Sequence, residues 1–86
     1  LAELQREVEG LVTEQVPITA DSPYDGRPLG DARVRTRTGA SIVAVVRAGR
    51  VHASPRPDFV FHEGDTVVVV GTAEGTHAVA EILASG

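Results

Sequence analysis

Residues 39–72, GASIVAVVRAGRVHASPRPDFVFHEGDTVVVVGT, decide the fold of this 86-residue chain. The run 41–47 is rich in β-branched residues and contains neither Gly nor Pro, and a second short run, 50–53, follows the dipeptide Ala48-Gly49. Two extended runs on either side of a two-residue gap that contains Gly are typical of a β-hairpin. The sequence therefore predicts a hairpin over residues 41–54.

The predicted hairpin has two faces, because side chains alternate along a strand and Arg47 is expected to lie opposite Arg50. One face is wholly apolar and is assigned to the core: Ile42, Ala44, Val46, Val51 and Ala53. The other face has an apolar base and a basic tip: Val43, Val45, Arg47, Arg50, His52 and Ser54. The second face is not needed for the core, so it is the more informative one for function.

A run of four consecutive valines lies in the segment 66–71, directly after the turn Glu63-Gly64-Asp65. A strand without polar alternation is typical of the middle of a sheet, covered on both faces. We therefore predict a central strand over 66–71, in which Val68 and Val69 are both buried although they point to opposite faces.

The remaining elements complete an α+β domain. A first strand is expected over 12–18, a short helix over 29–35 with Gly39 as a left-handed cap beyond it, and a last helix over 73–84 capped by Thr72. The predicted fold is a four-stranded sheet, with a central hairpin (41–54) and a central strand (66–71), between flanking helices. The order is β-α-β-β-β-α after a short N-terminal helix.

Residues 1–10 are predicted to form that N-terminal linker helix, and residues 11–86 a single domain. The helix follows from the apolar residues Leu1, Leu4, Val8 and Leu11, whose spacing gives one apolar face. The chain begins at Leu1 and contains no Met, so we expect it to be a segment of a longer protein.

The composition excludes several classes of protein. No cysteine is present, which excludes a disulfide framework and thiolate metal sites. No run of about 18 apolar residues predicts a membrane span, and no secretion signal is visible. With one Tyr, two Phe and no Trp, the core must be mostly aliphatic and thin. A core of this kind favours support from a partner subunit.

The charges are unevenly distributed although the net charge is −4. Seven of the eight basic residues, all arginines, lie within 27–56, where Asp31 is the only acid. Such a block favours a small anionic ligand, because guanidinium groups bind phosphate or carboxylate with two hydrogen bonds. It argues against DNA or RNA, which call for a domain-wide basic surface. The alternative is that the arginines only solvate exposed faces and pair with nearby acids, and that those of the hairpin bridge a dimer to acids such as Asp58 or Glu63.

Catalytic and metal-binding patterns are weak. The three histidines, His52, His62 and His77, have no spacing that brings two of them onto one helical face. Ser54, His52 and Asp58 lie close in sequence, but no strained nucleophile turn or oxyanion hole accompanies them. We expect no enzyme activity, no metal site and no cofactor, and Gly64-Asp65 is assigned to a turn.

Four motifs in order give the chain a resemblance to a known family. They are Arg47-Ala48-Gly49, the prolines Pro55 and Pro57, Gly64-Asp65 before the valine run, and Gly71-Thr72 after it. Together with the upstream loop SPYDGRPLGD, they resemble the TrkA C-terminal domain, also called the RCK C-terminal domain, over about residues 11–84. No G-x-G-x-x-G run is present, so no NAD or ATP site is expected here.

The resemblance implies a cytoplasmic regulatory domain that works as a homodimer. It would belong to a potassium channel, a potassium transporter or a cation/proton antiporter, peripheral to the membrane subunit and without membrane insertion of its own. Proteins similar to this one can hold cyclic di-AMP at the two-fold axis. The predicted ligand-binding residues lie on the second hairpin face: Val43, Val45, Arg47, Arg50 and His52. The alternative is a structural dimerisation module that binds no ligand.

Overall fold

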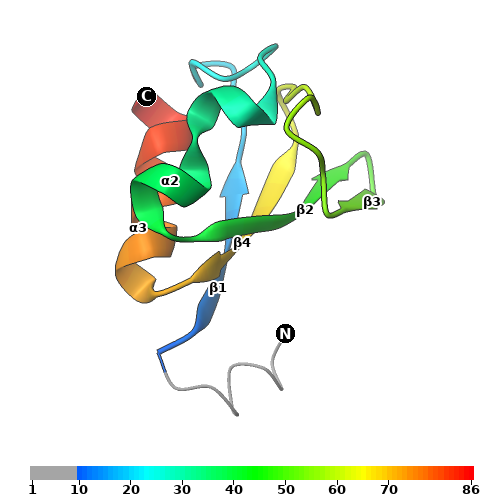
Figure 1. Ribbon diagram of the computed structural model, residues 1–86. Coiled ribbons are helices and arrows are strands. Elements are labelled where there is room, and N and C mark those ends of the chain that lie inside the picture. Colours follow the sequence, from blue (N-terminus) through cyan, green and yellow to red (C-terminus); the bar gives the residue numbers. More distant parts are fainter. Residues whose placement is uncertain (1–9) are drawn as a thin grey trace.

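The computed structural model describes residues 10–86 and consists of one antiparallel sheet with helices packed against it (Figure 1). The elements, in chain order, are β1 (Val12–Pro17), the 3-10 helix η1 (Leu29–Ala32), α2 (Val34–Thr38), β2 (Ser41–Arg47), β3 (Arg50–Ala53), β4 (Thr66–Gly71) and α3 (Ala73–Ser85). The four strands lie in the order β1-β4-β2-β3. The predicted α+β domain with a four-stranded sheet is confirmed. The predicted helix over 1–10 falls outside the described residues except for Gly10.

Strand β4 lies inside the sheet, between β1 and β2, as predicted. Val67 and Val69 are completely buried, together with Val79 and Leu83 of α3. Val68 and Val70 on the opposite face are only partly buried, so the prediction that Val68 is buried like Val69 is wrong. The helices that the structure describes pack on the Val67 and Val69 face, and none of them covers the other face.

The hairpin and its register are as predicted, with Arg47 opposite Arg50. The turn residues Ala48 and Gly49 have φ values of 50° and 76°, and a two-residue turn with both φ values positive matches the twist of the flanking strands. The predicted assignment of the two faces is wrong, however. Val45 is completely buried, whereas Val51, which was assigned to the core, is 68% exposed.

A bulge in β2 explains the exchanged faces. The pairing between β2 and β4 shifts between Ile42 and Ala44, so that Ile42 lies opposite Val69 and Val45 opposite Val67. A bulge inserts one extra residue and breaks the alternation of side chains. Ile42 and Val45 therefore both reach the core, although strict alternation would place them on opposite faces. Val45 and Arg47 thus lie on the core side of the sheet, together with His52, which pairs with Val45 but is exposed.

The short helix predicted over 29–35 is observed as two pieces, η1 and α2, which are separated by Arg33 with φ 49° and ψ 41°. Ala32 and Val34 on either side of the break are buried in the core. The predicted left-handed cap at Gly39 is confirmed by its φ of 78°. The predicted cap of the last helix is confirmed as well, because the Thr72 hydroxyl accepts a hydrogen bond from the Gly75 amide at 3.0 Å.

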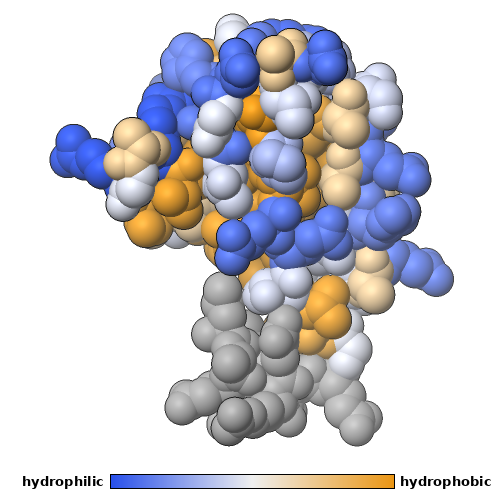
Figure 2. Space-filling model, turned by 180° about the vertical axis from the view of Figure 1, so that it is seen from behind, coloured by the Kyte–Doolittle hydropathy of each residue, from blue (hydrophilic) through white to orange (hydrophobic). Residues whose placement is uncertain are grey.

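Part of the molecular surface stays apolar. Figure 2, which shows the side opposite to that of Figure 1, has hydrophobic residues gathered near its centre with hydrophilic residues around them. The partly covered sheet face contributes Ala44, Val46 and Val68, and the edge strand β3 adds the exposed Val51. Within residues 10–86, no helix is long and apolar enough to cross a membrane.

Candidate functional site

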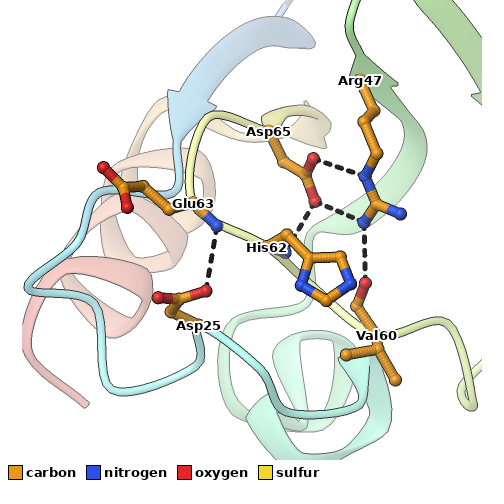
Figure 3. Close-up of polar contacts among 6 residues, drawn as sticks. All are labelled: Asp25, Arg47, Val60, His62, Glu63 and Asp65. Atoms are coloured by element: carbon orange, nitrogen blue, oxygen red, sulfur yellow. Dashed lines mark hydrogen bonds and ion pairs between the residues drawn. The ribbon is translucent and has the colours of Figure 1, made fainter.

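An ion pair between Arg47 at the end of β2 and Asp65 just before β4 lies at the centre of the candidate site (Figure 3). Arg47 Nε donates to Asp65 Oδ1 and Arg47 Nη2 to Asp65 Oδ2, each at 2.8 Å. Arg47 Nη2 also donates to the carbonyl oxygen of Val60 at 2.8 Å. The Asp65 side chain is fully buried and that of Arg47 is 34% exposed. The guanidinium therefore covers the carboxylate from the solvent side.

The turn before β4 holds the Asp65 carboxylate from the other side. The His62 amide donates to Asp65 Oδ2 at 2.9 Å, and the Asp65 amide donates to the His62 carbonyl oxygen at 3.0 Å. The neighbouring Glu63 amide donates to Asp25 Oδ1 at 2.9 Å, which ties the turn to the loop before η1 (Figure 3). Asp65 thus has the predicted role in the turn and, in addition, a buried ionic role that the sequence analysis missed.

These contacts set the ionisation of the pair. Burial alone would raise the pKa of Asp65, but the hydrogen bonds from Arg47 and from the His62 amide, with the positive charge of Arg47, outweigh burial and lower that pKa. The hydrogen bond to Asp65 raises the pKa of Arg47 against the opposing effect of burial. Both groups are therefore charged at neutral pH. The Nε and Nη2 groups of Arg47 are already hydrogen-bonded within the same chain.

The lowered pKa of Asp65 predicts a pH-dependent stability. An unfolded Asp titrates at about 3.9, so the contribution of Asp65 to the folded state is complete above that pH and is lost as the pH falls through the lower folded-state pKa. We expect the urea midpoint of unfolding to fall as the pH drops below about 4. The Asp65→Asn variant should show a shallower fall over the same range. Equal slopes in both proteins would contradict this assignment.

Phe59 connects the ion pair to the rest of the hairpin. The Arg47 guanidinium lies 4.9 Å from the centre of the Phe59 ring, and the His52 ring lies 5.4 Å from it in a tilted arrangement. Phe59 is partly buried and also contacts the fully buried Phe61 edge to face, with 6.5 Å between ring centres. The sequence analysis missed Phe59, although its alternation with Phe61 after the Pro-rich loop was a usable signal.

The five predicted site residues fall into three groups. Arg47 and His52 flank Phe59, and Arg50, opposite Arg47 at the hairpin tip, is exposed. Val43 lies at the bulge and is partly buried. Val45 is completely buried and supports the site from below without offering it a surface. The exposed side chains of Arg50 and His52 are therefore accessible to a ligand. So is Nη1 of Arg47, because the hydrogen bonds of Arg47 within residues 10–86 use only Nε and Nη2.

Within the single chain, Arg47 pairs with Asp65. Ionic contacts from the hairpin arginines to Asp58 or Glu63 across a dimer stay a prediction. Other charged side chains have partners away from Phe59. His77 pairs with Glu81 on the surface of α3 at 3.3 Å. Across the described part of the chain, no three or more acidic, His or Cys side chains come together as metal ligands.

Comparison with known proteins decides the family. The family model described as the TrkA-C domain matches residues 13–84. The chain belongs to the TrkA-C domain family. Two motifs of this TrkA-C domain are joined by the ion pair, because Asp65 of the Gly-Asp motif binds Arg47 of the Arg-x-Gly motif.

Two solved structures are similar in fold to this TrkA-C domain. The RCK_C domain dimer of S. agalactiae BusR in complex with c-di-AMP has a TM-score of 0.74 and 28% identity, and the match covers 83% of this chain and 93% of that one. The RCK C domain of the potassium transport protein KtrA, also in complex with c-di-AMP, has a TM-score of 0.79 at 21% identity over 93% of this chain and 88% of that one. At 21% identity the second likeness shows the fold alone.

Curated relatives of this TrkA-C domain act in ion transport. Potassium channel protein 1 of Methanocaldococcus jannaschii is 37% identical over 66% of this chain, which spans 17% of that protein. The Ktr system potassium uptake protein C of Bacillus subtilis is also 37% identical over 66% of the chain, which spans 26% of that protein. The ammonium/H(+) antiporter subunit AmhM of Alkalihalophilus pseudofirmus is 28% identical over 86% of the chain and 44% of that protein.

Proposed function

We propose that this TrkA-C domain is a cytoplasmic, non-catalytic regulatory module of a potassium channel, a potassium transporter or a cation/proton antiporter. In this proposal it works as a homodimer and senses cyclic di-AMP. The observation that carries the proposal is the likeness, at 28% identity and a TM-score of 0.74, to a domain dimer solved with c-di-AMP. Ligand binding would then bias the transporter by favouring one arrangement of the dimer.

A two-fold dinucleotide suits a symmetric dimer, because each protomer can offer the same groups to one half of the ligand. In each protomer the hairpin offers Arg50 for a phosphate and the exposed His52 ring for stacking. Arg47 Nη1 is a further donor, held in place by the bonds of Arg47 to Asp65. The proposed ligand-binding set is Val43, Arg47, Arg50 and His52, with Val45 as its buried support.

Dimerisation is supported by the apolar surface of the single chain. Val51 is 68% exposed, and Val46 and Val68 are only partly covered. A second copy that covers such side chains would remove apolar area from water, at roughly 25 cal/mol for each square ångström. The same surface also fits the alternative function, a structural dimerisation module that binds no ligand. A ligand titration separates the two.

Calorimetric titration of the 86-residue chain with cyclic di-AMP is the test, alongside sedimentation to establish the dimer. We expect one dinucleotide per two chains, and about tenfold weaker binding for Arg50→Gln because a charge-assisted hydrogen bond is lost. Arg27→Gln is the matched control, since Arg27 is an exposed arginine that pairs with Asp31 at 3.2 Å. A dimer that shows no binding would favour the structural alternative. A protein that stays monomeric with the ligand would contradict the proposal.

The predicted absence of DNA and RNA binding remains part of the proposal. S. agalactiae BusR has been solved in complex with its busAB-promotor DNA, and the match covers 95% of this chain but only 41% of that one. The larger share of BusR therefore lies outside the matched region. Of the arginines in the basic block, Arg27 and Arg47 are already paired with acids of the same chain, which weakens any basic surface.

A further inference from the structure

The outer edge of strand β3 has no neighbouring strand among the residues that the structure describes. β3 is the last strand in the order β1-β4-β2-β3, at the margin of the sheet (Figure 1), and all four of its residues are exposed. The edge of a sheet presents N–H and C=O groups that can pair with another extended chain. Several kinds of protein bind a partner in this way, by accepting one more strand.

The register of the hairpin decides which peptide groups of β3 point outward. In an antiparallel pair, alternate residues exchange hydrogen bonds with the opposite strand, and the residues between them turn their peptide groups away. The Ser54 amide donates to the Val43 carbonyl oxygen at 2.9 Å, so the even-numbered residues are the ones that bond to β2. The N–H and C=O groups of Val51 and Ala53 therefore point to the free edge. Within residues 10–86, no backbone group from outside the hairpin bonds to them.

The two faces of this edge differ in chemistry. Val51 lies opposite Val46, on the open face of the sheet, and its side chain is 68% exposed. Arg50 and His52 point to the other face, where the His52 ring lies 5.4 Å from the Phe59 ring. Residues that lie opposite each other on neighbouring strands stabilise a sheet when both are apolar or when their charges are opposite. A strand added here therefore needs apolar side chains that alternate with acidic ones.

A second copy of β3 does not provide that pattern. Two antiparallel copies that pair through their outward groups can be centred on Val51, His52 or Ala53. These three registers place Arg50 opposite His52, His52 opposite itself, or Arg50 opposite Arg56. Each register brings basic side chains together without an acid, and like charges directly opposite each other destabilise a pair of strands. The charges at this edge therefore favour an acidic partner over self-pairing.

We propose that the free edge of β3 binds an extended acidic segment of a partner protein, which adds a strand to the sheet. Apolar residues of that segment would lie beside Val51 and Ala53, and Asp or Glu residues beside Arg50 and His52. The Arg50 guanidinium suits a carboxylate, because it can donate two hydrogen bonds to it. This proposal goes beyond the dinucleotide function, since the ligand is a polypeptide and a single chain provides the whole edge.

The test is a titration of the 86-residue chain with the peptide acetyl-Glu-Val-Glu-Val-Glu-amide, followed by nuclear magnetic resonance. We expect saturable submillimolar binding. With the peptide at about ten times its Kd, the Val51 and Ala53 amides should exchange with solvent about tenfold more slowly. The peptides acetyl-Lys-Val-Lys-Val-Lys-amide, with the opposite charge, and acetyl-Glu-Glu-Glu-Val-Val-amide, without alternation, should each bind about tenfold more weakly. Cyclic di-AMP is left out, so a failure of the dinucleotide function does not affect the result.

Val51→Pro is the variant that blocks the edge, because it removes an outward N–H group and leaves the hydrogen bonds between β2 and β3 in place. Val51→Thr keeps that N–H group and is the matched control. We expect about tenfold weaker binding for Val51→Pro and a change below about threefold for Val51→Thr. The variant Arg50→Glu/His52→Glu, which is altered only at exposed side chains, should prefer the lysine peptide. It decides the question if Val51→Pro fails to fold.

Absence of saturation with the alternating glutamate peptide would overturn the proposal. Equal affinity of the two glutamate peptides would overturn it as well, because net charge alone would then explain binding. So would a folded Arg50→Glu/His52→Glu variant that still prefers the glutamate peptide, or a folded Val51→Pro variant with unchanged affinity. If the Val51 and Ala53 amides become protected as the protein concentration rises, without any peptide, a second copy covers this edge and the proposal is wrong.

Discussion

Replacement of Val69 by Asp is expected to unfold the domain. Val69 is completely buried in the inner strand β4, opposite Ile42 of β2 and Glu14 of β1. A carboxylate there would lose its hydration without a partner, which costs several kcal/mol. Because small domains are stable by only about 5–15 kcal/mol, this loss can equal the whole free energy of folding. Circular dichroism and urea unfolding of the Val69→Asp variant provide the measurement.

Val68→Asp is the matched control, because it introduces the same charge one residue earlier in the same strand. Val68 is partly exposed and lies on the sheet face that the described helices leave open. We expect this variant to fold, with a loss of about 1–2 kcal/mol in the free energy of unfolding. Equal losses at both positions in the monomer would mean that both faces of β4 are buried within one chain, contrary to this structure.

Replacement of Arg47 by Ala is expected to lower the free energy of unfolding by about 2–4 kcal/mol. Removal of one partner from a buried ion pair leaves the other charge without compensation, which typically costs 3–5 kcal/mol. The expected loss is set below that range because the Arg47 side chain is 34% exposed, whereas the Asp65 side chain is fully buried. Loss of the contact with Phe59 adds to the effect. Chemical unfolding at neutral pH measures it.

The double variant Arg47→Ala/Asp65→Ala is the control for that interpretation. It removes the stranded carboxylate together with its partner, so it should be more stable than Arg47→Ala alone. If the double variant loses the sum of both single losses, the two side chains act independently and the pair is not the cause. The expected instability also makes Arg47→Ala a poor probe of ligand binding, which is why Arg50→Gln carries that test.

Much of the fold could be predicted from local patterns. The Gly-containing turn at 48–49, the inner position of β4 and the Thr72 cap each depend on a few neighbouring residues, and each is confirmed. The exchanged hairpin faces could not be predicted in the same way. They depend on the bulge near Ala44, which arises where β2 meets β4 and leaves no mark in the alternation of an almost wholly apolar strand.

The position of Arg47 on the hairpin could be predicted, but its ion pair with Asp65 could not. The sequence analysis selected Arg47 and assumed that an arginine would avoid the core side of the hairpin. The structure shows the opposite, because Asp65 is fully buried there and compensates the guanidinium charge. Arg47 and Asp65 are 18 positions apart, so only the folded sheet brings them together. The break between η1 and α2 was missed because it depends on the left-handed Arg33 within an expected helix.

The strand order has a consequence for the kinetics of folding. β2 and β3 are joined by a two-residue turn, whereas β1 must find β4 across about fifty intervening residues. The entropy of closing a loop grows with its length, so the hairpin is the cheapest native contact to form and the β1–β4 ladder the most expensive. During synthesis on a ribosome, β1 is made before the other three strands of this sheet, and its one neighbour, β4, is made after them.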